Sequence, residues 1–583
     1  MFTENNTKYM IRSCCNKKLV YSIILGFAGL CSISVLSGCG QKDYKKDADE
    51  RVYKIIDQKW KDDLGSKANY KISDSTPSPN DIQIGKAVPA SGVLTLPQAV
   101  AIATAHNREY QTQKEELYIK ALDTRLIRHN FERLYYGRPK VTYTKAEGTE
   151  YVNVGAGVEP RFNPGRLGQD LPADDDGLRG EEFRIDDGFG FDQLLTDGTT
   201  IGANIALSWG RILNGTLKGE SLISVLSLEV AKPLLRGSDR KVVMENLTQA
   251  ERDTLYQVRL FNRFRKTFVV SVISQYYLAL QQYDAMKSAQ RNFNTLKWFY
   301  DKTEKLTKAG RLPKEEFDRI RQEVLQALDI YILAEKGYKQ TLDEFKITLS
   351  LPTTTEFQLD VNEIKVLKTK EMTYPDFTEN EAIESALVRR LDLVNSADAI
   401  TDAQRKVYVA ADGLRAQLDL GVNANIPLQD LSSSNSKVFQ DLLLSGLQVD
   451  LPFDRVAEQN IYRKSLIILN QRQRAYEQAA DTVKLEVRQA YRDLKEATQR
   501  YRVQMEALKV AEKRLKNTYL LLQYGRASSR RFLNAQNSMY NSQNAATEAL
   551  VNYMIATLNF YRDTEVLQVR PDGMWEQDNL TTQ

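Results

Sequence analysis

The sequence predicts a mainly α-helical chain with a smaller β-sheet portion, built from two similar halves. Three observations predict this fold class. Two stretches, 238–309 and 454–524, contain no proline and are far longer than the helices of compact domains. Segments that alternate polar and apolar residues precede each of them. Landmark motifs also occur twice, in the same order, along the 583 residues.

The N-terminus has the pattern of a secretory signal. Lys17 and Lys18 precede an apolar run, 19–35, and Leu-Ser-Gly-Cys at Cys39 follows. A basic region, a short apolar core and small residues before a cleavage point are typical of a signal peptide, here 1–38. A membrane-anchoring helix is the alternative, but the run is short for a span.

The cysteines add to this interpretation. All four (Cys14, Cys15, Cys31 and Cys39) lie in the signal or at its end, which excludes a disulfide framework. The Leu-Ser-Gly-Cys ending resembles the bacterial lipobox, so Cys39 would carry a covalent lipid and become the first mature residue. The following Gly40 and Gln41 do not resemble an inner-membrane retention signal, which favours the outer membrane.

The composition argues against an enzyme and against nucleic acid as a partner. Lys+Arg number 80 and Asp+Glu 76, and no clustered basic face is apparent. The chain has two histidines, His106 and His129, and no Walker loop, HExxH or CxxC motif. We therefore expect no catalytic residue, no metal site and no cofactor apart from the lipid on Cys39.

The repeat defines the boundaries. Ala99 and Ala103 align with Ala382 and Ala386 at an offset of 283, and each pair opens a predicted helix of roughly 37 residues, ending near Tyr136 and Gly413. The resulting segments are a signal (1–38), an N-terminal linker (39–92), a first repeat (93–349), a linker (350–377), a second repeat (378–568) and a tail (569–583).

A second landmark shows that the first half contains an insertion. The motif that begins Ala309-Gly-Arg-Leu and ends at Phe317 parallels the motif that begins Tyr524-Gly-Arg-Ala and ends at Phe532, at an offset of 215. The offset shrinks by 68 residues between the two landmarks, so the first half is longer by that amount. The strand-like region occupies 138–236 in the first half and only about 416–453 in the second.

The strand-like segments have one apolar and one polar face. Residues 417–426 and 446–453 alternate apolar residues with Gln, Asn, Asp and Gly, and 201–209 and 222–230 do much the same. A membrane barrel strand with lipid outside and water inside needs this pattern. An ordinary sandwich strand is the alternative. No segment after the signal has about 18 consecutive apolar residues, which favours the barrel.

The long helices are predicted to pack as coiled coils. At 1.5 Å per residue, roughly 70 residues span about 105 Å. In the second stretch Leu, Val or Tyr recurs every seventh residue, with alanine at a companion position, and a strict period of seven requires supercoiled partners. The heptad residues are Val487, Leu494, Tyr501, Leu508, Leu515 and Leu522, with Ala490, Ala497 and Ala511. Return helices, 313–349 and 528–563, are about half as long.

Over 93–568 the chain resembles the TolC family of outer-membrane factors. The motifs that carry the resemblance are the opening Leu-Pro-Gln-Ala-Val-Ala-Ile-Ala from Leu96, two strand-to-helix corners at 231–237 and 449–454, and the paired turns Ala309-Gly-Arg-Leu and Tyr524-Gly-Arg-Ala. Any one motif is weak, but their order and spacing are specific.

The resemblance implies a homotrimer with a twelve-stranded β-barrel continuous with a long α-helical barrel, two strands coming from each of two repeats per chain. Linker 350–377 and both mature termini would form a belt around the tunnel. The implied function is the outer-membrane channel of a tripartite efflux pump or type I secretion system, a passive conduit. Its partners would be outer-membrane lipid, a periplasmic adaptor and, through the adaptor, an inner-membrane pump. The cargo (drug, metal ion or protein) and the pump type are left open.

Part of the first half departs from the family pattern. Residues 160–220 hold more strand-like sequence than a plain hairpin needs, and added strands, an extracellular loop and a plug all remain open. Acidic residues between Asp170 and Asp187 lack the spacing of an EF-hand. A solvated loop is favoured there over a cation site.

In the family, the turns at the ends of the long helices contact the adaptor. By position, the candidate docking residues are Gly310, Arg311, Leu312, Gly525, Arg526 and Ala527. Helix termination alone also explains both glycines, because a left-handed backbone costs glycine little.

The charged residues beside these turns form a second candidate site. Some relatives carry an acidic ring after the second turn, but Arg531 and Asn534 occupy the matching positions here. Glu315, Glu316 and Asp318 of one turn could instead pair with Arg526, Arg530 and Arg531 of the other and hold the end closed. A solvated cluster that contributes almost nothing is the alternative.

A different class of protein is the main alternative overall. A lipid-anchored coiled-coil structural or adhesive outer-membrane protein would share the anchor and the helices but have no pore. It predicts that 417–426 and 446–453 do not form amphipathic strands.

Overall fold

We describe the fold from a computed structural model. It describes residues 41–60, 67, 69–72, 92–137, 140–147, 150–151, 180–214, 220–310, 313–369, 378–427, 444–451, 453–570 and 575–577. The chain divides into two compact units, Met1–Gln58 and Lys59–Gln583. Helix α2 (Gln41–Lys59) is the described element that begins in the first unit. All other elements belong to the second unit, which we describe by itself.

Both halves follow the same helical plan. A pair of short helices leads into the sheet, a long helix leaves it, and a helix about half as long returns after a turn. The predicted long and return helices are confirmed, except that Met244 interrupts the first turn of the first long helix. The helices of the first half are α4 (Leu96–His106), α5 (Arg108–His129), α6 (Arg240–Val243), α7 (Glu245–Lys308) and α8 (Lys314–Thr348); those of the second are α10 (Glu379–Arg389), α11 (Leu391–Asp412), α12 (Val456–Gln523) and α13 (Ser529–Asp563).

The prediction of one continuous opening helix in each half is wrong. Asn107 and Arg390 have extended backbones, with ψ 131° and 117°, and each separates two helices. The Asn107 side chain accepts a hydrogen bond from the backbone N–H of Tyr110 at 3.0 Å and so caps the next helix. The two breaks are 283 residues apart, the same offset as the alanine motif. The first pair also ends at His129, before the predicted Tyr136.

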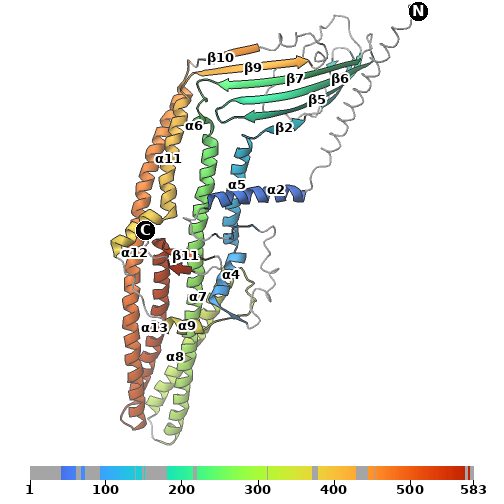
Figure 1. Cartoon of the computed structure of the whole chain (residues 1–583). Helices are drawn as coiled ribbons and strands as arrows, with labels where there is room; N and C mark the ends of the chain where they lie inside the picture. Colours follow the sequence, from blue (N-terminus) through green and yellow to red (C-terminus); the bar gives the residue numbers. More distant parts are fainter. Residues whose placement is uncertain are drawn as a thin grey trace, which may run out of the picture. The chain divides into compact units, whose positions relative to one another are not determined.

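The helices form a single curved layer (Figure 1). Near the turns, the contact order is α8, α7, α13, α12, and near the sheet it is α5, α7, α11, α12. Helices α7 and α12 therefore run through both levels. Helix α12 forms one edge of the layer, and α5 and α8 form the other.

The predicted heptad seam on α12 is confirmed. Val487, Leu494 and Tyr501 are buried, and the later heptad residues are half-buried. The companion alanines, Ala490, Ala497 and Ala511, are also buried. Small side chains at these positions let α12 approach its neighbours α11 and α13 closely.

One antiparallel sheet lies at the other end of the layer (Figure 1). Its strand order is β10-β9-β7-β6-β5-β3-β4, and β2 also pairs with β5. The sheet is open, because among the described residues the outer sides of β10 and of most of β3 pair with no strand. The strands are β2 (Leu134–Gly137), β3 (Lys140–Glu147), β4 (Glu150–Tyr151), β5 (Gly180–Leu194), β6 (Thr200–Asn214), β7 (Glu220–Pro233), β9 (Gln417–Pro427) and β10 (Leu444–Asp450).

Among the described residues, the expectation of two strands per repeat holds for the second half and is wrong for the first. The second half contributes β9 and β10, whereas the first contributes β2 to β7 to the same sheet. Of the open interpretations of 160–220, added strands are therefore found within 180–214. Glu181, Glu182, Asp186 and Asp187 lie in β5, so this part of the acidic stretch is strand rather than loop.

Small elements lie against the middle of α7. β1 (Val93–Leu94) pairs in parallel with β8 (Gln358–Leu359), α9 (Asn362–Thr369) follows, and β11 (Leu567–Val569) pairs with β12 (Trp575–Gln577). The Tyr276 hydroxyl of α7 donates to the carbonyl oxygen of Leu94 at 3.0 Å. Within the described residues, no helix has an apolar stretch long enough to cross a membrane.

Candidate functional site

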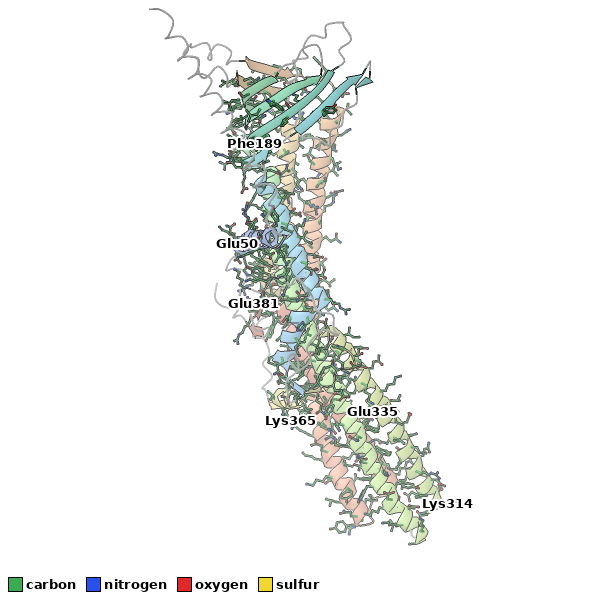
Figure 2. All side chains as sticks on the ribbon, turned by 90° about the vertical axis from the view of Figure 1, so that its right-hand side faces the viewer. Glu50, Phe189, Lys314, Glu335, Lys365 and Glu381 are labelled. Atoms are coloured by element: carbon green, nitrogen blue, oxygen red, sulfur yellow. The ribbon has the colours of Figure 1, made fainter. Side chains whose placement is uncertain are left out.

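Two helix turns lie at the end of the helical layer that is farthest from the sheet. Figure 2 shows Lys314 at this end and Phe189 in the sheet at the opposite end. Gly310 and Gly525 follow the long helices and share a φ of +69°, a left-handed conformation that glycine adopts without strain. A Cβ atom at either glycine would meet no atom within 4 Å. Backbone conformation, rather than crowding, therefore explains both glycines.

Hydrogen bonds close the second turn. The backbone N–H of Gly525 donates to the carbonyl of Leu522 at 3.1 Å, and that of Arg526 donates to Leu521 at 2.8 Å. This pair of bonds is the Schellman arrangement, which satisfies the last carbonyls of a helix. Arg526 is exposed and Ala527 half-buried, so both can be reached from solvent. Of the other candidate docking residues, Arg311 and Leu312 lie outside the described residues.

An aromatic cluster holds the two turns together. Phe317 and Phe532, which align in the repeat, pack on the long helix α7. The ring centroids of Phe532 and Phe299 are 4.8 Å apart, and those of Phe317 and Tyr300 are 5.0 Å apart. The repeat aligned the two phenylalanines, but nothing in the sequence paired them with α7. The buried cluster consists of Leu296, Phe299, Ile320, Ala327, Phe532 and Leu533.

The charged residues beside the turns are not paired across them within one chain. Among the described residues, no ion pair joins Glu315, Glu316 or Asp318 to Arg526, Arg530 or Arg531. Glu315 instead lies 3.7 Å from Arg319, one turn along the same helix. Asn534 and Arg531 are exposed. A latch between different copies of the chain therefore stays a prediction.

The sheet has one mainly apolar and one mainly polar face across its long strands, although Asp187 and Gln193 of β5 take positions on the apolar face. In one row Phe189, Ile205, Leu226 and Ile426 lie side by side on β5, β6, β7 and β9. In the next row, on the opposite face, the positions hold Gly190, Asn204, Ser227 and Asn425. Successive residues of a strand point to opposite faces, so this alternation separates the two kinds of side chain. Large exposed side chains of the apolar face include Ile185, Phe189, Ile205, Leu228, Val230, Leu420, Leu447 and Val449.

The polar face holds a small charged network. The Arg184 Nε donates to Asp186 Oδ1 at 2.9 Å and to Ser208 Oγ at 3.0 Å. The Ser208 hydroxyl also donates to Asp186 Oδ1 at 2.6 Å. These three side chains of β5 and β6 therefore satisfy one another's hydrogen-bonding groups.

Two buried ionic clusters, which the sequence did not reveal, join the halves. In one, Lys266 and Arg263 of α7 contact Glu565, just after α13. In the other, Asp402 of α11 accepts hydrogen bonds from Tyr256 at 2.7 Å, from Arg405 at 2.8 Å and from Arg252. Burial raises the pKa of Asp402, but these hydrogen bonds outweigh it and hold that pKa below its usual value.

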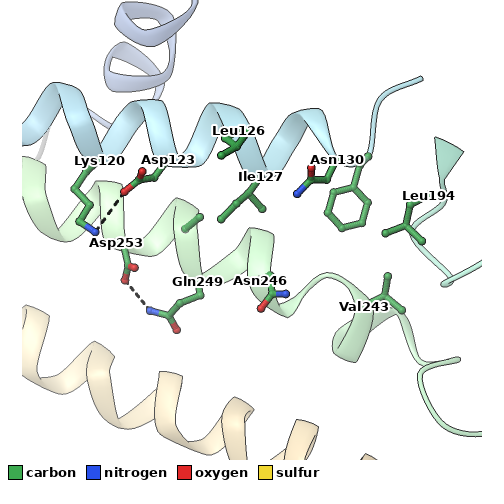
Figure 3. Close-up of a pocket in the computed structure, with 12 residues that line it drawn as sticks. Lys120, Asp123, Leu126, Ile127, Asn130, Leu194, Val243, Asn246, Gln249 and Asp253 are labelled. Carbon is green, nitrogen blue, oxygen red and sulfur yellow. Dashed lines mark hydrogen bonds and ion pairs between the residues drawn. The ribbon is translucent and has the colours of Figure 1, made fainter. Parts of the chain in front are cut away.

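A groove lies between α5 and α7 beneath the sheet (Figure 3). Its lining includes Leu126, Ile127, Leu194 and Val243, together with polar residues such as Asn246. The described lining holds no hydroxyl, thiol or imidazole group that could act as a nucleophile. Within the described residues, no group of three or more His, Cys, Asp or Glu side chains is placed to hold a metal ion. Cys39, the candidate lipidation residue, lies outside the described residues.

Known structures share the fold of this chain and resemble it weakly in sequence. No protein-family model and no curated protein sequence matches it. The outer-membrane channel OprN is 13% identical, with a TM-score of 0.54 over 86% of this chain and 98% of that one. The CmeC outer-membrane channel of Campylobacter jejuni is 12% identical (TM-score 0.53, 89% and 93%). The open MtrE outer-membrane channel of Neisseria gonorrhoeae is 13% identical (TM-score 0.53, 86% and 95%).

Proposed function

We propose that this chain, which has the TolC-like fold of outer-membrane channels, is the outer-membrane component of a tripartite efflux pump or type I secretion system. It would act as a passive conduit from a periplasmic adaptor to the exterior. The observation that carries this proposal is a sheet with one apolar and one polar face, continued directly by a curved layer of long helices. Such a sheet can separate lipid from water only when it closes.

One chain supplies an open segment of that wall. β10 ends the sheet on the side of α12, and β3, with the two-residue strand β4 at its end, ends it on the side of α5. The two edges of one chain differ, so copies that pair one edge with the other join head to tail and form a ring when the rotation between them closes. The number of copies follows from the resemblance to TolC, which implies a homotrimer.

Exposed apolar side chains support joining at these edges. Helix α12, at one edge of the layer, exposes Val503 and Val510, seven residues apart. Helix α8, at the other edge, exposes Leu325 and Ile332, also seven residues apart. Helix α13, in the middle of the layer, exposes no large hydrophobic residue over its described length. A neighbouring copy would cover these stripes as coiled-coil seams.

The remaining parts of the proposal concern attachment. Acylation of Cys39 would anchor the chain to the outer membrane, with the helical layer extending into the periplasm. The exposed turn at Gly525 and Arg526 would then present itself to the adaptor. The poreless alternative is disfavoured, because it predicts no strands at 417–426 and 446–453, where β9 and β10 are found.

The test is the assembly and conductance of the purified, acylated protein. We expect a trimer in detergent, a β signal in circular dichroism, heat-modifiable migration on gels and discrete conductance steps in planar bilayers. A monomeric, purely helical product without conductance would overturn the proposal. A Cys39→Ala variant serves as the control: it should lose lipid and keep the folded trimer when it is refolded in detergent.

Adaptor docking has a separate test. Arg526→Glu should weaken co-purification with an adaptor encoded beside this chain, because the exposed guanidinium is lost without disturbing the buried cluster. Lys339→Glu, on the exposed middle of α8, is a matched charge reversal away from the turns. Equal adaptor recovery for both variants would count against docking at this turn.

A further inference from the structure

We propose that each chain contributes six strand positions to the barrel wall, so that three copies close an eighteen-stranded barrel rather than a twelve-stranded one. The two additional positions are β5 and β6. This inference rests on the proposed function, because it takes the trimer and the closed wall from it. It makes residues 180–214 part of the wall rather than a plug or an external loop.

The pairing of β5 and β6 places them inside the sheet. β6 pairs with β7 from Thr200 opposite Ala231 to Arg211 opposite Glu220 without a break. β5 pairs with β6 along nearly its whole length, with one register shift at Glu181. On its other side β5 pairs with β2 and then with β3, which follow one another along the same edge and occupy one position. Within the described residues the long positions are therefore β10, β9, β7, β6, β5 and β2/β3. The two-residue strand β4 pairs only with Ala146 and Glu147 at the end of β3 and adds no long position.

The side chains of β5 and β6 match those of the wall strands. Phe189 and Ile205 are 41% and 42% exposed on the apolar face, as Leu228 of β7 is at 40%. On the other face β5 and β6 carry Asp186, Ser208 and Asn204, like the polar residues of β9. A plug in a water-filled lumen would have no use for a lipid-compatible face. β5 and β6, with 15 residues each, are also longer than the 9–11 residues that a tilted spanning strand needs.

The turn between β5 and β6 fixes the hairpin to the wall. Gly198 in this turn has a φ of +81°, and a Cβ atom there would lie 2.6 Å from the carbonyl oxygen of Gly237 and 2.9 Å from Pro233 Cγ. The turn therefore packs closely against the end of β7, where the chain enters α6. A connection this short and this tightly packed gives the hairpin no freedom to leave the sheet.

The helices show how the wall widens. α5 and α7 touch directly, with 2.7 Å between the hydroxyl oxygens of Thr124 and Thr254. The strands that continue them, β2 and β7, are separated by β5 and β6. The chain thus adds two strand positions without adding a helix. The groove of Figure 3, lined by Leu194 and Val243, lies where α5 and α7 approach the sheet.

The number six also satisfies the geometry of closure. Directions alternate along the sheet, so β10 and β3 run in opposite directions at its two edges. β10 of one copy can then pair with β3 of the next in the antiparallel sense, as every other pair does. Barrel diameter grows roughly linearly with strand number, so eighteen strands give a mouth about 1.5 times as wide as twelve. Porins of 16–18 strands leave an aqueous channel.

Cysteine cross-linking in the full-length, membrane-inserted protein tests the count. No cysteine follows Cys39, so no later native thiol competes with the introduced cysteines for the cross-linker. Asn204→Cys with Ser227→Cys joins β6 to β7, and Tyr136→Cys with Ser227→Cys probes β2 against β7 at the same height. In the six-position wall the two cysteines of the second pair are three strand spacings apart, about 14 Å. A short bis-thiosulfonate cross-linker cannot bridge that distance.

We expect the Asn204–Ser227 pair to link within the chain in high yield and the Tyr136–Ser227 pair not to link. The reverse result would overturn the inference, because it would place β2 beside β7 and the hairpin outside the wall. A third set, Thr142→Cys with Gly446→Cys, Gln448→Cys or Asp450→Cys, reports on the junction between copies. That junction exists with either count, so absence of any linked trimer there would overturn the proposed function instead. Should a cysteine variant fail to assemble, strand counting by electron cryomicroscopy of the unmodified trimer in nanodiscs decides between eighteen and twelve.

Discussion

Lys266 Nζ lies 2.9 Å from Glu565 Oε1, and the two side chains are 6% and 5% exposed. Arg263 Nη1 contacts the other carboxylate oxygen at 3.0 Å. Glu565 follows α13, so this cluster fixes the end of the second repeat to the long helix of the first. Removing one member of a buried pair leaves an uncompensated charge, and the resulting loss exceeds the stability that the pair itself contributes.

Glu565→Gln should therefore destabilise the folded chain strongly. We expect a loss of about 3–5 kcal/mol, since the substitution leaves Lys266 buried without a counter-charge. The measurement is thermal unfolding in detergent, followed by circular dichroism. Glu506→Gln removes an exposed partner of Lys509 on α12 and should leave the melting temperature almost unchanged. Equal effects of the two substitutions would contradict the role of burial.

The Asp402 cluster predicts a dependence on acid pH. The pKa of Asp402 is lower in the folded chain than in the unfolded chain, where the pKa of an aspartate is about 3.9. Its contribution to stability is then complete above that value and is lost as the pH falls through the lower, folded pKa.

We expect the wild type to be more stable than Asp402→Asn at neutral pH, and the gap between them to narrow below about pH 4. The melting temperatures of both proteins between pH 7 and pH 3 measure this difference in stability. A gap of constant size over this range would show that the Asp402 carboxylate does not supply the difference.

The helices near the turns could be predicted closely because local signals mark their ends. Gly310 and Gly525 adopt left-handed conformations that few other residues tolerate, and Pro313 precedes the first helical residue of α8. The break at Asn107 has a local signal, because asparagine is a favoured N-cap residue, whereas arginine at 390 gives none. Arg390 is buried and bonded to Asp392 and Glu486, a tertiary contact that no local pattern shows.

The two-faced pattern of the strands could be predicted from the sequence, whereas the number of strands and their pairing could not. The alternation in 417–426 and 201–209 predicted two-faced strands, since that signal lies within a single strand. The partners of β5 were not predictable, because its sequence mixes glycine with charged residues, and only pairing with β3 and β6 sets its two faces apart. The ionic clusters were hidden for the same reason, since Lys266 and Glu565 are 299 residues apart.

The close packing of Gly198 predicts that a single methyl group disrupts the β5–β6 turn. Gly198→Ala adds a Cβ that clashes with backbone at Gly237, and overpacking of this kind costs about 1–3 kcal/mol. The yield of heat-modifiable trimer from membranes should fall. Gly188→Ala is the matched control in β5, because its Cβ would lie at an ordinary 3.5 Å from Asn204. Normal trimer yield for Gly198→Ala would mean that the turn is free to move.

The predicted latch between the turns leads to a test of charge. If carboxylates such as Glu316 pair with Arg530 of a neighbouring copy in the closed state, Glu316→Lys replaces attraction with repulsion. We expect a rise in single-channel conductance and in leakage of large antibiotics into cells.

Adding Arg530→Glu should restore both toward the wild-type values, because the swapped pair attracts again. Glu335→Lys, farther from the turns on α8 (Figure 2), loses only an exposed pair with Lys339 of the same helix and should change neither. Exposed ion pairs contribute at most about 1 kcal/mol each, so the effect depends on three symmetric copies acting together. Unchanged conductance and leakage in Glu316→Lys would leave these charges as a solvated cluster.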